Sequence, residues 1–269
     1  MQLPLSESDF MQIVQANELF IGLDRDGTLV PYTLTPDMAY VDKTVLDIVQ
    51  LLTNTKNTTV AIVSARGLNQ LKKDFPFNNI VLAGSCGLEI SYPDHKIITN
   101  ETALRIKPLL PELIEALQSL IKSKYQAIIE NHGLTVCLHT KLISDRSILQ
   151  NIEKKVIALG KIFPQLQINK LETTYEFYPN INWSKGMAVE TIFKDSALDF
   201  NQGLSIFVGD SQADESAYEV INSYNGITFK VIHNQNVSKA KILLNSEKIL
   251  IAMLDQVARV RCNLFGKIS

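Results

Sequence analysis

The stretch LFIGLDRDGTLV, residues 19–30, begins as a run of apolar residues and then places two aspartates beside a glycine and a threonine. A continuous apolar run of this length is typical of a strand that is buried on both faces of a sheet. Two carboxylates separated by one residue are costly at the end of such a strand, because each loses hydration and the two charges repel. A cation between them removes this cost, so the pattern first indicates a metal site.

The composition is that of an ordinary globular protein. The chain has 269 residues, of which 46% are hydrophobic, which suffices for one large domain or for a core domain with a smaller one. The 26 basic and 28 acidic side chains nearly balance, and no block of like charge predicts binding to nucleic acid or to a membrane surface. We therefore expect a small-molecule substrate.

The sequence shows no targeting or membrane-spanning segment. Its first residues include acidic side chains where a signal peptide has basic ones, and no apolar run approaches the length of a membrane span. The cysteines Cys86, Cys137 and Cys262 lie far apart, without the spacing of a zinc site. We expect a soluble, cytoplasmic protein with reduced thiols, and we expect it to be a monomer.

Three further apolar runs end in small or acidic residues, namely residues 59–63 before Ser64, residues 80–83 before Gly84, and residues 204–208 before Gly209 and Asp210. The segments between such runs show helical periodicity, as in residues 41–52 and 185–193. This alternation predicts an α/β fold with a doubly wound, mostly parallel, Rossmann-like sheet. In such a sheet, ligands bind at the carboxyl ends of the strands.

The pattern changes between residues 92 and 179. The predicted elements there are a helix over residues 101–122, alternating segments at 125–130 and 134–139, a helix over 145–161, and strands at 165–170 and 174–178. This order predicts an α+β cap domain, in which two helices cover a small antiparallel sheet. We therefore expect a core of residues 1–91 and 180–269 and a cap of residues 92–179. The tail beyond about residue 220 gives little signal.

Asp24 and Asp26 stand two residues apart, so both side chains project to the same side of an extended chain. One carboxylate can act as a nucleophile on phosphorus, while the second serves as general acid and then as general base. Gly27 permits the tight turn that brings the second carboxylate over the site. The alternative for this motif alone is a strand end followed by a solvated turn.

The segment GLSIFVGDSQADE, residues 203–215, adds two more carboxylates. Asp210 comes just past a strand and Asp214 follows at the start of a helix, so both can complete an oxygen-rich Mg²⁺ site with Asp24. Asp214 has two alternatives to direct ligation, which are support of the site from outside the metal shell and interaction with the helix dipole.

Ser64 and Lys185 are suited to binding a phosphate. The Ser64 hydroxyl at a strand end can hydrogen-bond a phosphoryl oxygen, and Lys185 at a helix start supplies a compact positive charge. Either residue alone is more often structural, as a helix-capping serine or a solvated lysine. The same design of an apolar strand followed by the required residue recurs along the chain, which favours the phosphate site.

These motifs resemble those of the haloacid dehalogenase superfamily of aspartate-nucleophile phosphatases. The set consists of D-x-D-G-T at residues 24–28, Ser64 after a strand, Lys185-Gly186, and G-D-x-x-x-D at residues 209–214, in the family's order. The resemblance implies that Asp24 is the nucleophile and Asp26 the acid/base, with Ser64 and Lys185 as the other catalytic residues. It also implies that Asp24, the backbone carbonyl of Asp26 and Asp210 ligate Mg²⁺, with Asp214 completing or supporting the metal site.

Five segments are more specifically similar to trehalose-6-phosphate phosphatases, namely VSARGLNQL (63–71), LAGSCGLEI (82–90), IIENHGLTVCLHT (128–140), YEFYPNINWSKGMAVE (175–190) and FVGDSQADESAYEVI (207–221). This similarity implies hydrolysis of trehalose 6-phosphate. The chain departs from the family pattern at His132, where a lysine is usual, and at Tyr178, where an arginine is usual. Ala65, Ser211 and Ala213 are further departures. The altered cap positions leave the identity of the sugar open.

Carried over position by position, the resemblance implies that Glu130, His132, His139 and Glu176 bind the sugar. The alternative interpretation is that these four residues are polar side chains on the solvent face of the cap sheet and bind no sugar. Arg66 either holds phosphate or pairs with a core carboxylate, and we favour the pair. Trp183 either stacks on a sugar ring or packs at the hinge between the domains.

Three other functions stay open at this point. One is a phosphatase for another sugar phosphate, of the mannosyl-3-phosphoglycerate or sucrose phosphate type. A second is a catalytically silent sensor of sugar phosphates, although such a protein is free to lose Asp24, Asp26 and Lys185, and all three are present. LDRDGTLV also resembles histidinol-phosphate and heptose-bisphosphate phosphatases, but those have a zinc loop and lack a large cap.

Overall fold

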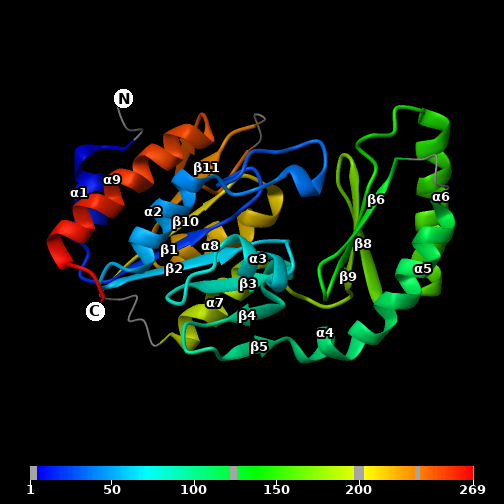
Figure 1. Cartoon of the computed structure of the whole chain (residues 1–269), viewed down its shortest axis with the longest axis horizontal. Coiled ribbons are helices and arrows are strands. Elements are labelled where there is room, and N and C mark those ends of the chain that lie inside the picture. The colour runs from blue at the N-terminus through cyan, green and yellow to red at the C-terminus, as the bar shows by residue number, and fades with distance from the viewer. Residues whose placement is uncertain (1–4, 122–125, 197–202, 234–236, 269) are drawn as a thin grey trace.

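The computed structural model describes residues 5–121, 126–196, 203–233 and 237–268. Within these residues the strands form an eight-stranded sheet and a four-stranded sheet, which lie in two bodies side by side (Figure 1). Lys122 and Tyr125, where the sequence predicted the end of a helix and the start of a strand, lie outside the described residues.

The strands of the larger sheet are β1 (Leu19–Leu23), β2 (Thr58–Val63), β3 (Val81–Gly84), β4 (Glu89–Ser91), β5 (Ile97–Thr99), β10 (Leu204–Gly209), β11 (Ile227–Val231) and β12 (Ile242–Leu244). Their order is β12-β11-β10-β1-β2-β3-β4-β5. The six strands from β12 to β3 are parallel, and β4 and β5 add an antiparallel hairpin at one edge. The predicted mostly parallel sheet is confirmed, and the four predicted strands occupy its centre.

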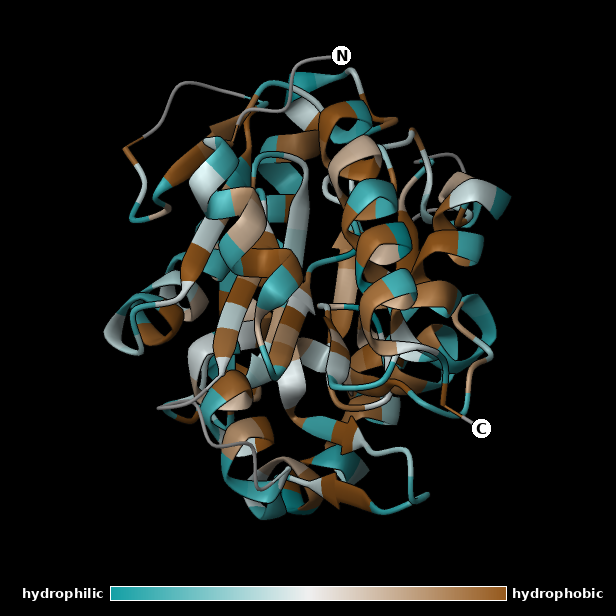
Figure 2. Ribbon diagram, turned by 90° about the vertical axis from the view of Figure 1, so that its left-hand side faces the viewer, coloured by the Kyte–Doolittle hydropathy of each residue, from teal (hydrophilic) through white to brown (hydrophobic). Residues whose placement is uncertain are grey.

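Helices cover both faces of the larger sheet, as a doubly wound fold requires (Figure 1). The helices on one face are α1 (Glu7–Gln15), α2 (Lys43–Thr53), α3 (Leu68–Asp74) and α9 (Glu247–Phe265), and those on the other are α7 (Lys185–Asp195) and α8 (Glu215–Ser223). In β1, Leu19 and Ile21 pack toward the first group, whereas Phe20 packs toward α7 and α8. Figure 2 shows the same arrangement, with brown strands between helices that alternate brown and teal.

The smaller sheet is antiparallel, in the order β6-β7-β9-β8. Its strands are β6 (Ile128–Asn131), β7 (Val136–His139), β8 (Leu166–Lys170) and β9 (Thr174–Pro179). The helices α5 (Leu110–Leu120) and α6 (Arg146–Ile162) cover one of its faces (Figure 1). This unit is the predicted α+β insertion, and we call it the cap.

The single helix predicted over residues 101–122 is wrong in one respect. The structure divides it into α4 (Glu101–Ile106), the 3-10 turn η3 (Lys107–Leu109) and α5. Pro108 and Pro111 lie at this break, and each proline lacks the N–H that an unbroken helix donates. The break lets α4 lie between the larger sheet and the cap, while α5 packs in the cap (Figure 1).

The boundary predicted at residue 92 falls inside the hairpin of β4 and β5. Ile90 of β4 lies opposite both Ala83 of β3 and Ile98 of β5, so β5 belongs to the larger sheet by its pairing. Strand pairing therefore extends the larger sheet to Thr99. Both three-residue strands are too short for the sequence pattern to reveal.

The chain beyond residue 220, which gave little sequence signal, completes the core. It supplies β11, β12 and α9, and α9 packs against α1 and α2. The remaining 3-10 turns are η1 (Pro36–Met38), η2 (Ser85–Gly87) and η4 (Gln212–Asp214). Among the described residues, no helix has both the length and the apolar character needed to traverse a bilayer.

Candidate active site

Three aspartates meet at the carboxyl ends of the central strands. Asp24 follows β1 and Asp210 follows the neighbouring parallel strand β10, and Asp214 belongs to η4 just beyond. The Asp24 N–H donates to the carbonyl of Val208 at 2.9 Å, which extends the strand pairing to the aspartate itself. One carboxylate oxygen from each aspartate lies within 4.8 Å of the other two, and all three residues are buried.

The buried carboxylates need a positive partner. Burial raises the pKa of Asp24, the Asp214 charge raises it further, and the Lys185 charge opposes both. Burial and Asp214 raise the pKa of Asp210 to about 6, although a hydrogen bond from Tyr32 opposes the shift. The buried Oδ1 atom of Asp210 has no hydrogen-bond partner among the described residues. A buried, unsatisfied carboxylate oxygen in an acidic cluster fits a hard divalent cation such as Mg²⁺.

Lys185 is the first residue of α7 and supplies one buried positive charge. Its Nζ atom lies 2.8 Å from Asp24 Oδ1 and 2.7 Å from Asp214 Oδ1. Burial alone lowers the pKa of Lys185, but the charges of Asp214 and Asp24 raise it well above its usual value. Lys185 is therefore protonated, and it holds the nucleophile candidate Asp24 from the side of α7.

Both carboxylate oxygens of Asp214 are already engaged. Oδ1 accepts from Lys185, and Oδ2 accepts from the N–H of Asp210 at 3.2 Å and the N–H of Ser211 at 2.9 Å. The Ser211 hydroxyl donates to the same oxygen at 2.7 Å. A Cβ on Gly209 would lie 2.3 Å from Asp214 Cγ, so only glycine leaves room for this arrangement. Of the roles predicted for Asp214, support of the acidic cluster fits these contacts.

Asp26 lies in the turn that follows β1, and Gly27 allows this turn with φ of +78°. The Asp26 carboxylate accepts from Arg66 Nε at 2.9 Å and from Arg66 Nη2 at 3.0 Å. It also accepts from Arg25 Nη1 at 2.6 Å. The structure thus shows the pairing of Arg66 with a core carboxylate, which was the favoured expectation.

Ser64 directly follows β2, the strand beside β1, so its position is adjacent to that of Asp24 along the edge of the sheet. Its N–H donates to Ala83 O at 3.0 Å, and its hydroxyl oxygen accepts from the Arg66 N–H at 3.2 Å. Ser64 thus lies at the strand end, as the sequence predicted, and the structure adds that it is buried.

Three residues of the site went unrecognised in the sequence. Arg25 is fully buried, and its Nε donates to Asp74 at 2.8 Å while a second nitrogen donates to the Ala39 carbonyl. The Tyr32 hydroxyl donates to Asp210 Oδ2 at 2.7 Å, and His233 Nε2 lies 2.8 Å from the Gly27 carbonyl oxygen. Arg25 is the variable residue of D-x-D, and the other two lie outside every motif, so no sequence signal marked them.

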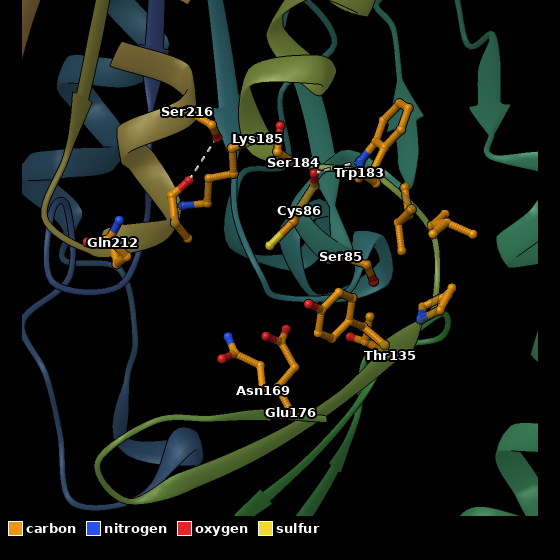
Figure 3. Close-up of a pocket in the computed structure, with 15 residues that line it drawn as sticks. Ser85, Cys86, Thr135, Asn169, Glu176, Trp183, Ser184, Lys185, Gln212 and Ser216 are labelled. Carbon is orange, nitrogen blue, oxygen red and sulfur yellow. Dashed lines mark hydrogen bonds between the residues drawn. The ribbon is translucent and has the colours of Figure 1, made fainter. Parts of the chain in front are cut away.

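A cavity of about 300 Å³ opens between the larger sheet and the cap (Figure 3). Its lining includes Lys185 and Cys86 from the core and Asn169, Glu176 and Tyr178 from the cap sheet. Burial raises the pKa of Glu176, and the nearby His132 opposes this shift. The cavity therefore connects the lysine of the acidic centre with polar side chains of the cap.

The predicted substrate-binding residues fall into two groups. Glu176 lines the cavity, whereas Arg66, Glu130, His132 and His139 are not among its lining residues and contact one another beside it. Trp183 lines the cavity and donates from Nε1 to the Cys86 carbonyl at 3.1 Å. It also packs against the cluster of Leu88, Ala103 and Leu134, which fits the hinge role.

Comparison with known proteins shows the family of the chain. The model of the trehalose-phosphatase family matches residues 22–248. The chain belongs to the trehalose-phosphatase family. The match includes Asp24, Lys185 and Asp210, and it spans most of the core and the whole cap of this family member.

Among curated relatives, this trehalose-phosphatase family member is 25% identical over 273 residues to probable trehalose-phosphate phosphatase 3 of Oryza sativa subsp. japonica, covering 94% of the chain and 74% of the relative. It is 27% identical over 234 residues to probable trehalose-phosphate phosphatase I of Arabidopsis thaliana, covering 82% of the chain. The alignment covers 63% of that second relative's length.

Two solved structures share the fold. A trehalose-6-phosphate phosphatase related protein superposes with a TM-score of 0.78 at 20% identity, covering 91% of this chain and 99% of that one. The C-terminal domain of C. albicans trehalose-6-phosphate phosphatase gives a TM-score of 0.79 at 15% identity, covering 96% of this chain and 99% of that one. At these identities the likeness concerns the fold, including the cap.

Proposed function

We propose that this chain is a Mg²⁺-dependent phosphatase that hydrolyses trehalose 6-phosphate to trehalose and phosphate. The observation on which the proposal rests is the contact of Lys185 with Asp24 at a buried acidic centre beside the cavity. Membership of the trehalose-phosphatase family supports this reaction, and the curated relatives have names that specify it.

In the proposed reaction, a carboxylate oxygen of Asp24 attacks the phosphorus atom, and the bond from phosphorus to the sugar oxygen breaks. Asp26 donates a proton to the departing sugar oxygen. It then takes a proton from the water that attacks the aspartyl phosphate, which restores Asp24 and releases phosphate. Lys185 and Ser64 bind the phosphoryl oxygens, because one supplies a fixed charge and the other a hydroxyl donor.

We propose that Asp24, Asp210 and the backbone carbonyl of Asp26 hold Mg²⁺, with Asp214 fixing Lys185 and the loop after β10. The unpartnered Oδ1 of Asp210 supports this assignment. Bound Mg²⁺ polarises the phosphoryl group and neutralises part of its negative charge. Both carboxylate oxygens of Asp214 already accept hydrogen bonds from the protein, so we assign it the supporting role.

The sugar is proposed to lie in the cavity between the larger sheet and the cap. Glu176 is our first candidate for a contact with a sugar hydroxyl, because its carboxylate points into the cavity beside Asn169 (Figure 3). Tyr178 lines the same cavity at a position where the family usually has an arginine. This difference keeps another sugar phosphate as the second candidate substrate.

The proposal is tested by phosphate release in the presence of Mg²⁺ from trehalose 6-phosphate, sucrose phosphate, mannosyl-3-phosphoglycerate and glucose 6-phosphate. We expect the highest kcat/KM for trehalose 6-phosphate, no release after addition of a chelator, and no release by D24N. A different preferred sugar would replace the substrate but keep the reaction. Activity that persists in D24N or in chelator would refute the mechanism.

The division into a core and a cap domain that close around the substrate is part of the same proposal. Closure excludes bulk water from the phosphoryl transfer. The cytoplasmic location and the monomeric state stay predictions from the sequence.

A further inference from the structure

A chain of charged side chains connects the core to the cap beside the acidic centre. Arg66, just after β2 in the core, binds the Asp26 carboxylate through Nε and Nη2 at 2.9 and 3.0 Å. Its third nitrogen, Nη1, donates to Glu130 Oε1 at 2.6 Å, and Glu130 lies in β6 of the cap. One guanidinium thus joins the proposed acid/base residue to the cap sheet.

The cap side of this bridge is fixed by two histidines. Glu130 Oε2 lies 2.9 Å from His139 Nε2 and 3.2 Å from His132 Nε2, the latter without the direction of a hydrogen bond. Burial alone raises the pKa of Glu130, but His132, His139 and Arg66 lower it, so Glu130 is ionised. The other ring nitrogen of His139 lies 3.2 Å from Thr174 Oγ1, which orients the ring. Both oxygens of Glu130 are therefore engaged.

The core side of the bridge is fixed as well. The Arg66 N–H donates to the Ser64 hydroxyl oxygen at 3.2 Å, and the Arg66 carbonyl accepts from the Ser85 N–H at 2.8 Å. A guanidinium that binds a carboxylate through two nitrogens sets the plane of that carboxylate. The direction of the Asp26 side chain therefore depends on where Arg66 is held, and Glu130 holds it from the cap.

We infer that Arg66 is a positioning residue through which Glu130 of the cap aims the Asp26 carboxylate at the reacting oxygen when the cap is closed. This inference rests on the proposed function. According to this inference, Glu130, His132 and His139 act in the chemical step, whereas the resemblance implied that they contact the sugar. Glu176 then remains the candidate for the sugar contact in the cavity. Proton transfer is then efficient only while the cap covers the substrate.

Another contact between the two bodies provides a matched control. Lys141 of the cap donates from Nζ to the Thr33 carbonyl at 2.7 Å, and among the described residues no hydrogen bond or ion pair joins it to Arg66, Asp26 or Glu130. K141M therefore removes a contact between core and cap without altering the bridge. The test compares R66M, E130Q, their double variant and K141M, with R66K as the conservative change, after circular dichroism confirms that each is folded.

The substrates are trehalose 6-phosphate, phenyl phosphate and 4-nitrophenyl phosphate, the last two of which have no sugar. We expect R66M and E130Q to lower kcat for all three by about ten- to a hundredfold with KM little changed, because misplacement by about 1 Å costs up to 10²-fold. The double variant should be no slower than R66M alone, and R66K should recover part of the loss. K141M should retain the wild-type kcat.

The leaving group adds a signature of proton donation. Phenolate is a poorer leaving group than 4-nitrophenolate, so R66M should lower kcat/KM for phenyl phosphate more than for 4-nitrophenyl phosphate. A loss confined to KM for trehalose 6-phosphate in E130Q would make Glu130 a sugar ligand and overturn the inference. A rise in KM for all substrates with kcat retained in R66M would make Arg66 a phosphate ligand and overturn it too.

The proposed function and this inference fail in different ways. If the wild type releases no phosphate from any of the three substrates, the proposed function is wrong and the inference falls with it. If the wild type is active while R66M and E130Q match K141M, the inference alone is wrong.

Discussion

At the scale of single residues, the decisive feature is a lysine between two buried carboxylates. Lys185 contacts both Asp24 and Asp214, and all three side chains are nearly inaccessible to solvent. The attraction within such a group offsets the cost of burying its charges only while both signs are present. The same lysine therefore serves stability and the charge balance of the site.

K185M should abolish phosphate release and lower the free energy of unfolding, measured by urea denaturation without Mg²⁺, by about 3 kcal/mol, because two buried carboxylates lose their cation. The control is K194M, in the last turn of the same helix, where the side chain is exposed. We expect K194M to change neither quantity. Equal stability of K185M and wild type would show that the lysine does not balance these charges.

The sequence indicated most of the site residues but not their partners. Asp24 and Asp210 each follow a recognisable strand, and Lys185 begins a recognisable helix. Because the two strands are parallel neighbours, the sequence could predict that these residues lie close together. Arg25 and Tyr32 came to light only in the structure, because each acts through a contact with a residue distant in the chain, Asp74 and Asp210 respectively. A pattern along the chain does not encode such pairings.

At the scale of elements, the last helix is tied to the first by one buried arginine. Arg261 of α9 donates to the carbonyls of Ile13 and Val14 at 3.2 Å and of Ala16 at 2.9 Å, at the end of α1. It also donates to the Asn57 carbonyl at 2.7 Å. Burial lowers the pKa of Arg261 to about 10, so the guanidinium is still charged at neutral pH. Carbonyls at a helix end need donors, and here a side chain provides them.

R261M should lower the free energy of unfolding by about 3 kcal/mol, because several buried carbonyls lose their donor at about 1 kcal/mol or more each. R259M is the matched control on the same helix, since Arg259 is exposed and its one ion pair among the described residues is with Asp255, four residues away. Such a surface pair contributes less than about 1 kcal/mol. Urea denaturation of both variants checks this, and comparable losses in the two would contradict it.

The elements that the sequence predicted well are those with long, regular patterns. The apolar runs of β1, β2 and β10 and the periodicity of α6 identified them to within a residue or so. The three-residue strands β4, β5 and β12 are too short to show a period. The prediction of a single helix over residues 101–122 missed the break at Pro108, although a proline inside a helix removes a hydrogen bond.

At the scale of the whole molecule, two bodies meet at a cavity, and Lys185, which contacts the acidic centre, lines its core side (Figure 3). The metal should stabilise the folded state, because Asp24, Asp210 and Asp214 repel one another in its absence.

Addition of Mg²⁺ should raise the midpoint of thermal unfolding. A ligand at 100 times its dissociation constant stabilises the folded protein by about 2.7 kcal/mol. D210N should lose most of this shift, because it removes a carboxylate of the acidic cluster that has an unpartnered oxygen. A shift as large in D210N as in the wild type would mean that Mg²⁺ binds elsewhere.

The central claim is that the Asp24 carboxylate receives the phosphoryl group. The most direct measurement is rapid acid quenching during turnover of trehalose 6-phosphate with Mg²⁺, followed by mass spectrometry of the peptide that contains Asp24. We predict one phosphoryl group on Asp24, released by hydroxylamine as expected for an acyl phosphate. Phosphate release without any phosphorylated Asp24, or with the phosphoryl group on a different residue, would contradict the account.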